Sequence, residues 1–108
     1  MTENEIAKQI VDVAFKIHTT LGPGLLESVY ETIMAFELQK RGLQVRRQQA
    51  IPVVYEDVRM DLGVRAIAPV HKKQLLTYLR LTDKRLGLLI NFNVELIKNG
   101  ISRVVNGL

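Results

Sequence analysis

The segment GPGLLESVYE, residues 22–31, places a carboxylate and a phenol close together behind a glycine-rich turn. Glu27 and Tyr30 are three residues apart, so on a helix they stand on adjacent turns. A carboxylate at a helix start could serve a metal or phosphate site, with the phenol orienting it. Alternatively, Glu27 complements the helix dipole and Tyr30 lies at the margin of the core. Spacing alone favours this structural interpretation, because one carboxylate holds a catalytic metal poorly.

A second polar stripe lies further along the chain, where His71, Gln74 and Tyr78 recur at helical spacing. Amide and phenol groups in this arrangement could hold a phosphate or a base, and they could equally be hydrogen-bonded groups at the edge of the core. Both interpretations stay open. A zinc site is not expected, because the chain has two histidines, no cysteine and no HExxH spacing.

The densest basic pairs are Arg46 with Arg47 and Lys72 with Lys73. Such pairs can bind phosphates, although solvated surface charge explains each pair taken alone. The formal net charge of +4 and the isoelectric point near 9.6 are compatible with a polyanionic partner. The charge therefore moves the expectation slightly toward nucleic acid.

Size and composition indicate one soluble globular domain. The 108 residues are 47% hydrophobic and 24% charged, which excludes a disordered chain. No cysteine is present, so disulfides are excluded. The first ten residues are acidic and polar, and no apolar run approaches the ~18 residues that span a bilayer. A soluble cytoplasmic protein is therefore expected.

Hydrophobic periodicity predicts two helices at the start of the chain. Thr2 and Glu5 have capping-box spacing ahead of a first helix over about residues 3–20, which the Gly-Pro-Gly turn ends. A second helix begins near Leu25 and ends in KRGL. Its predicted buried face consists of Leu26, Val29, Ile33 and Phe36.

Strand patterns follow, interrupted by one more helix. VVY before Glu56 and alternating residues from Val58 predict a hairpin with a two-residue turn. Helical spacing returns after Pro69 up to about Leu81. The apolar run 86–92 predicts a strand buried on both faces, and ISRVV predicts a last strand.

With these segments in view, the chain resembles the GxxExxY protein family, whose motif stands here as Gly24, Glu27 and Tyr30. The likeness extends over IVDVAFKIHTTLGPGLLESVYE, IPVVYEDVRMDLGVRA and the stretch that begins PVHKKQLL. It implies membership of the PD-(D/E)XK nuclease-like proteins, with a mixed sheet flanked by helices. Gln74 and Tyr78 resemble the QxxxY element of the RecB-like branch. The resemblance thus makes Glu27, Gln74 and Tyr78 remnants of a catalytic site.

The resemblance also implies a missing piece. In the family, the pair seen here as Arg65-Ala66 is followed by an aspartate that opens a strand, a turn, and a strand carrying Glu-x-Lys. Here Ala66 runs directly into IAPVHKKQLL, so about two strands, on the order of 15 residues, are absent. The lost piece would hold the metal-binding carboxylates and the catalytic lysine.

The expected fold is α/β (α+β), a reduced restriction-endonuclease-like core. It consists of a small mixed sheet of about four strands flanked by three helices in the order ααββαββ. A single domain is expected over residues 1–108, with an internal truncation near 66–68. Losing central strands exposes sheet edges, so the edges either re-pair or join two chains into a homodimer.

Three functions are consistent with this pattern. The favoured one is a catalytically inactive nuclease-like protein that binds DNA or another nucleic acid, needs no cofactor and contacts phosphates through the basic pairs. The second is an active nuclease that holds Mg²⁺ or Mn²⁺ with Glu27 and Asp61, in a site rebuilt within one chain or shared across a dimer. The third is a protein-interaction module that recruits a partner strand at an exposed sheet edge.

Overall fold

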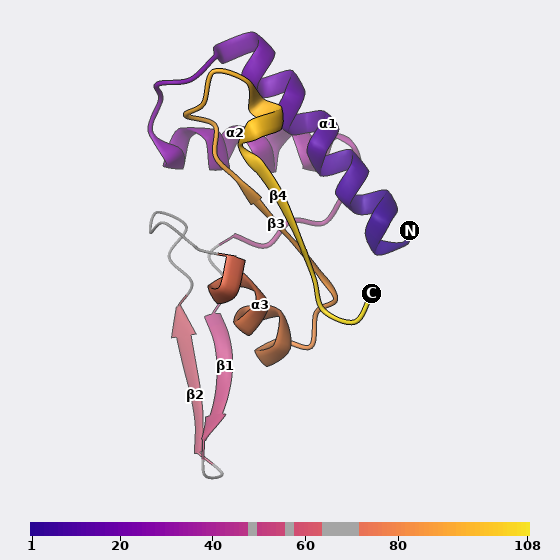
Figure 1. The fold of residues 1–108 in the computed structure, drawn as a ribbon, viewed down its shortest axis with the longest axis vertical. Helices are drawn as coiled ribbons and strands as arrows, with labels where there is room; N and C mark the ends of the chain where they lie inside the picture. The colour runs from indigo at the N-terminus through magenta and orange to yellow at the C-terminus, as the bar shows by residue number, and fades with distance from the viewer. Residues whose placement is uncertain (48–49, 56–57, 64–71) are drawn as a thin grey trace.

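The computed structural model describes residues 1–47, 50–55, 58–63 and 72–108 (Figure 1). The order of helices and strands is ααββαββ, with a short 3-10 helix before the last strand, and the fold class agrees with the prediction. The predicted Glu56-Asp57 turn, His71 and the predicted truncation point near 66–68 lie outside the described residues. The elements are α1 (Glu3–Leu21), α2 (Glu27–Lys40), β1 (Ala50–Tyr55), β2 (Val58–Gly63), α3 (Lys72–Leu81), β3 (Leu86–Ile90), η1 (Ile97–Asn99) and β4 (Ile101–Val105).

Helix α1 begins and ends close to the predicted residues. The Thr2 hydroxyl oxygen accepts a hydrogen bond from the Glu5 amide at 3.2 Å, which satisfies one of the free amides of the first turn. The helix ends at Gly22, which has a φ of +70°. Glycine adopts this backbone conformation with little steric strain, because it has no Cβ. Val13, Ala14 and Ile17 are buried, as their spacing predicts, whereas Ile6 near the helix start is exposed.

Helix α2 buries a different face from the predicted one. Tyr30, Ala35 and Leu38 are buried, and Ile33 and Met34 pack against the core. The predicted face was wrong for three of its four residues, which are exposed to solvent. The exposed fractions are 75% for Leu26, 37% for Val29 and 59% for Phe36. The helix carries apolar residues on two sides, so its sequence does not decide which side turns inward.

The four strands pair as two antiparallel sheets of two strands each within the described residues. Strand β1 pairs with β2, from Ala50 opposite Gly63 to Tyr55 opposite Val58, which confirms the predicted hairpin. Strand β3 pairs with β4, from Leu86 opposite Val105 to Ile90 opposite Ile101. The described strands therefore do not form the single mixed sheet that the resemblance implies.

The predicted strand over residues 86–92 is shorter and less buried than expected. It ends at Ile90, and all five residues of β3 are half-buried, because a two-stranded sheet shields its strands less than a larger sheet does. Phe92 is buried, but it lies beyond the strand, in the loop that leads to η1.

The main core lies between α1, α2 and the segment around η1. It consists of Val13, Ala14, Ile17, Tyr30, Leu38, Phe92 and Ile97. Away from it, the β1–β2 hairpin projects beyond α3 to the opposite end of the molecule from α1 and α2 (Figure 1). The Cα radius of gyration is 14.5 Å, against about 13 Å for a compact domain of this length. No helix among the described residues is long and apolar enough to cross a bilayer.

Candidate functional site

The Gly-Pro-Gly turn ahead of α2 is held by two side chains, one from α2 and one from the loop after β3. The Tyr30 hydroxyl donates a hydrogen bond to the Gly22 carbonyl oxygen at 2.5 Å and accepts one from the Leu25 amide at 3.2 Å. From the far end of the chain, the Asn93 side-chain oxygen accepts a hydrogen bond from the Gly24 amide at 2.8 Å. The turn is thereby fixed to both α2 and the loop after β3.

A second bond ties this loop to α1. His18 Nε2 lies 2.7 Å from the Val94 carbonyl oxygen, so this nitrogen carries the hydrogen and donates it. The Asn93 amide donates to the Asn91 side-chain oxygen at 2.9 Å, which holds the loop in a tight bend. The residues before α2 and the loop 91–95 therefore form one hydrogen-bonded unit.

The Tyr30 ring lies in the core. It stacks on the Phe92 ring with a centroid separation of 4.5 Å and an angle of 9° between the ring planes, and the side chain is 1% exposed. Its hydrogen bonds go to Gly22 and Leu25, and it forms none with Glu27. Tyr30 is therefore a packing and turn-fixing residue, buried more deeply than the core margin that its sequence position suggested.

Glu27 is the first residue of α2 and lies exposed. This position complements the positive end of the helix dipole. Its carboxylate forms no ion pair or hydrogen bond within the described residues. No group of three His, Cys, Asp or Glu side chains gathers as a metal site in the described part of the chain. The described residues around Glu27 therefore do not fit a divalent metal.

Asp61 lies in β2, opposite Pro52 of β1. Figure 1 shows β2 and α2 toward opposite ends of the long axis. The elements that carry Asp61 and Glu27 are thus not brought together within one chain.

Gln74 and Tyr78 lie on adjacent turns of α3, four residues apart. The Tyr78 side chain is half-buried, and its hydroxyl has no hydrogen-bond partner among the described residues. Helix α3 packs against the β3–β4 sheet and β1, whereas α2 packs against α1. Glu27 and the Gln74-Tyr78 pair therefore lie on helices in different parts of the fold.

The basic pairs differ in their surroundings. Arg47 is engaged: its guanidinium lies 3.4 Å from a Glu31 carboxylate oxygen and donates to the Thr32 hydroxyl at 2.9 Å. Arg46 is exposed and has no ion-pair partner among the described residues. Lys72 and Lys73 are the first two residues of α3. Of the Arg46-Arg47 pair, Arg46 is thus the freer to meet an external phosphate.

A further basic group was missed from the sequence, although two of its members, Lys84 and Arg85, are adjacent. Arg80 in the last turn of α3, and Lys84 and Arg85 before β3, are all exposed. Arg85 donates to the Gly107 carbonyl oxygen at 3.1 Å, which uses one end of its guanidinium. A count by segment would have found them: residues 72–108 hold two acidic residues, Asp83 and Glu95, against seven basic ones. These are Lys72, Lys73, Arg80, Lys84, Arg85, Lys98 and Arg103.

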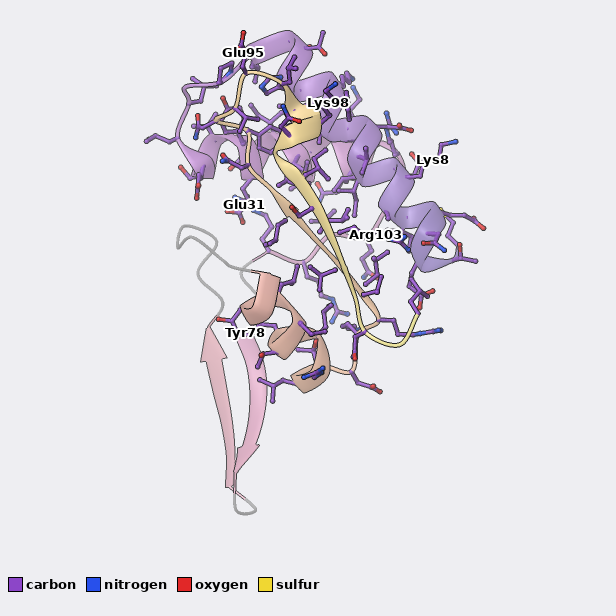
Figure 2. The ribbon with its side chains drawn as sticks, viewed as in Figure 1. Lys8, Glu31, Tyr78, Glu95, Lys98 and Arg103 are labelled. Atoms are coloured by element: carbon purple, nitrogen blue, oxygen red, sulfur yellow. The ribbon has the colours of Figure 1, made fainter. Side chains whose placement is uncertain are left out.

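Not all of these cations lie on one surface. Figure 2 shows Arg103 in β4 close to the first part of α1, where it donates a hydrogen bond to Asn4, and Lys98 near the far end of α1. The basic residues at the two ends of α3, in contrast, are held near one another by a single helix and the turn that follows it.

Comparison with known proteins identifies the family. A family model described as the PD-(D/E)XK nuclease superfamily matches residues 4–66 and, as a second segment, residues 61–104. Neither the curated proteins nor the solved structures give a match. Since the two matched segments span most of the sequence, the chain belongs to the PD-(D/E)XK nuclease superfamily.

Proposed function

We propose that this chain is a GxxExxY-type nuclease-fold domain that does not cleave nucleic acid and binds its phosphate backbone. The observation that carries the loss of cleavage is in the sequence: no Glu-x-Lys occurs anywhere in the 108 residues. Hydrolysis of a phosphodiester by a metal ion needs ligands that hold the ion and shield the developing charge. Of the metal-binding carboxylates that the resemblance implies, Glu27 is the one that remains, and a single carboxylate holds such an ion poorly.

The way in which the family model matches supports an internal deletion. The two matched segments overlap at residues 61–66, the place where the resemblance to the GxxExxY family breaks off. A chain that lacked a central piece would match in two such segments. The proposed loss of the Asp and Glu-x-Lys strands accounts for this pattern.

The basic surplus of residues 72–108 supports the binding half of the proposal. Arg80, Lys84 and Arg85 are exposed around the C-terminal end of α3, and Lys72 and Lys73 stand at its other end. A surface of this kind attracts phosphates without reading bases, so binding would be indifferent to sequence and sensitive to salt. Arg46 is a further exposed candidate.

Binding is tested by fluorescence anisotropy with labelled duplex and single-stranded DNA in EDTA, across a range of salt concentrations. A surface of this size should give a slope of log K against log salt of about 2 to 4 in magnitude for duplex DNA. The double variant Arg80→Gln/Lys84→Gln should weaken binding and reduce the slope. The control Lys8→Gln/Lys98→Gln removes the same charge from exposed positions on α1 and η1 and should change binding less. Salt-independent binding, or equal losses in both variants, would contradict the proposed surface.

Cleavage is tested separately, by incubating the chain with plasmid and single-stranded DNA in Mg²⁺ or Mn²⁺. The proposal expects no turnover above that of the buffer. Turnover that disappears in Glu27→Ala would overturn the inactive assignment and favour a metal site rebuilt around Glu27. The binding part and the no-cleavage part of the proposal can thus be refuted independently of each other.

A further inference from the structure

Strand β3 has one edge that pairs with β4 and one that faces away from it. The Asn91 amide donates to the Gly100 carbonyl oxygen at 2.8 Å, and the Asn106 amide donates to the Arg85 carbonyl oxygen at 2.8 Å. In an antiparallel pair, hydrogen-bonded positions alternate along the strand. Gly87 and Leu89 therefore direct their backbone groups toward β4. The amides and carbonyls of Leu86, Leu88 and Ile90 point outward.

The outward edge of β3 has no backbone partner in the described part of the chain. Its residues form no backbone hydrogen bond to any described residue other than those of β4. The faces of the strand, in contrast, are in contact with helices: α3 lies on one, where a Cβ at Gly87 would come within 2.9 Å of the Leu75 side chain. Ile90, on the opposite face, packs against the main core. Among the described residues, the strand is thus supported on its faces and open along one edge.

This edge also lacks the features that natural proteins use to prevent edge-to-edge pairing. Such features are charged residues, prolines and bulges. Strand β1 contains Pro52, β2 contains Arg59 and Asp61, and β4 contains Arg103. Strand β3, LGLLI, is the one strand among the four described that has neither a charge nor a proline.

The sequence of β3 is compatible with antiparallel pairing to itself. A two-fold axis at Leu88 would place Leu86 opposite Ile90 of a second copy, and all the outward-pointing groups would meet in hydrogen-bonded positions. The flanking Arg85 would lie opposite the neutral Asn91 of the other chain. No like charges would therefore face one another across the pair.

The other open edge of the ribbon does not suit the same arrangement. The outward positions of β4 are Ile101, Arg103 and Val105. Pairing about the central residue would put Arg103 directly opposite Arg103 of a second copy, and like charges in that position are destabilising. Charge thus distinguishes the two edges.

We propose that two copies of this chain associate through β3, antiparallel and centred on Leu88, to form a four-stranded sheet in the order β4-β3-β3-β4. The hydrogen bonds along the outward edge and the apolar side chains of Leu86, Leu88 and Ile90 hold the two strands together. This association does not depend on nucleic-acid binding or on cleavage.

The mass of the full chain in solution is measured by sedimentation equilibrium as a function of concentration. A species of twice the 12.3 kDa chain mass is expected at high concentration. Leu88→Pro removes an outward amide and no β3–β4 hydrogen bond, and it should weaken dimerisation at least tenfold. Val105→Pro makes the same change on the outward edge of β4 and should leave the dimer in place. A wild-type chain that stays monomeric throughout, or equal dimer loss in both folded variants, would overturn the proposal.

Cross-linking is a second measurement of the dimer, and it does not require the proline variants to fold. The chain contains no cysteine, so Leu88→Cys introduces a single thiol. In the proposed dimer the two thiols lie across a hydrogen-bonded pair whose Cα atoms are about 5.5 Å apart, within reach of a short bismaleimide. In the control Val105→Cys the corresponding Cα atoms would be about 20 Å apart, from the strand spacing and rise. Efficient dimer cross-linking of Leu88→Cys and not of Val105→Cys is expected, and the reverse preference would refute pairing through β3.

Discussion

The Tyr30 hydroxyl donates to the Gly22 carbonyl oxygen at 2.5 Å, across eight residues and the whole Gly-Pro-Gly turn. The Tyr30 hydroxyl oxygen also accepts a hydrogen bond from the Leu25 amide, so one phenol satisfies two backbone groups that the turn leaves without partners. Gly24 and Tyr30 of the GxxExxY motif thus belong to one hydrogen-bonded unit that fixes how α2 begins. The motif retains a structural use here that does not require Glu27 to bind a metal.

Removing this hydroxyl should destabilise the fold. We expect Tyr30→Phe to lower the free energy of unfolding by about 1–3 kcal/mol, because Gly22 and Leu25 lose their partner in a partly buried place. Urea denaturation followed by circular dichroism measures the change. The matched control is Tyr78→Phe, whose hydroxyl has no hydrogen-bond partner among the described residues, and the effect there should be smaller. Equal effects in the two variants would argue against the role given to Tyr30.

Asn93 should protect the turn locally. Its side-chain oxygen accepts from the Gly24 amide, so in Asn93→Ala that amide should exchange with solvent faster while amides in the middle of α1 keep their rates. Hydrogen exchange observed by NMR at single residues tests this. Asn99→Ala changes an exposed asparagine of η1 whose side chain forms no hydrogen bond with the described residues, and it should leave the Gly24 amide unaffected.

Patterns with one dominant period predict this fold well. The α1 face, the cap at Thr2 and the β1–β2 register follow from apolar spacing and local hydrogen bonding, which short stretches of sequence determine. The turn at Gly22 follows from its glycines and proline in the same way.

Features that depend on distant partners were not predictable. Helix α2 has apolar residues on two sides, and what selects the inward one is the stack of Tyr30 on Phe92, 62 positions later in the sequence. The half-burial of β3 depends on how many strands pair beside it. Among candidate site residues, adjacency in sequence identified Arg46 and Arg47, but the partners of Arg47 lie on α2.

The Lys16–Glu37 ion pair between α1 and α2 should make stability depend on pH. The hydrogen bond from Lys16 Nζ, 2.8 Å from a Glu37 carboxylate oxygen, is the main cause that lowers the pKa of Glu37 below its ordinary value of 4.5. A lowered pKa in the folded state stabilises the fold above the unfolded-state value, and this stabilisation is lost as the pH falls through the folded-state value.

We therefore expect Glu37→Gln to be less stable than wild type at pH 7, with a difference that shrinks as the pH falls below about 4.5 and the wild-type carboxyl is protonated. Urea denaturation at a series of pH values measures it. In a Lys16→Met background the cost of Glu37→Gln at pH 7 should be smaller, because the main partner is gone. A difference between the two chains that does not change between pH 7 and pH 3 would show that the ion pair contributes nothing.

Gly100 is required by the close approach of two backbone segments. It accepts a hydrogen bond from the Asn91 amide, and its own φ of −96° suits any residue. A Cβ at this position would collide with the Asn91 carbonyl oxygen, a backbone atom held where β3 ends. We expect Gly100→Ala to lower the free energy of unfolding by about 1–3 kcal/mol, as overpacking does. Gly87→Ala is the control: its Cβ would meet the flexible end of the Leu75 side chain, which can move aside, so the loss should be smaller. Chemical denaturation of both variants tests the difference, and a Gly100→Ala chain as stable as Gly87→Ala would contradict the close approach between Gly100 and Asn91.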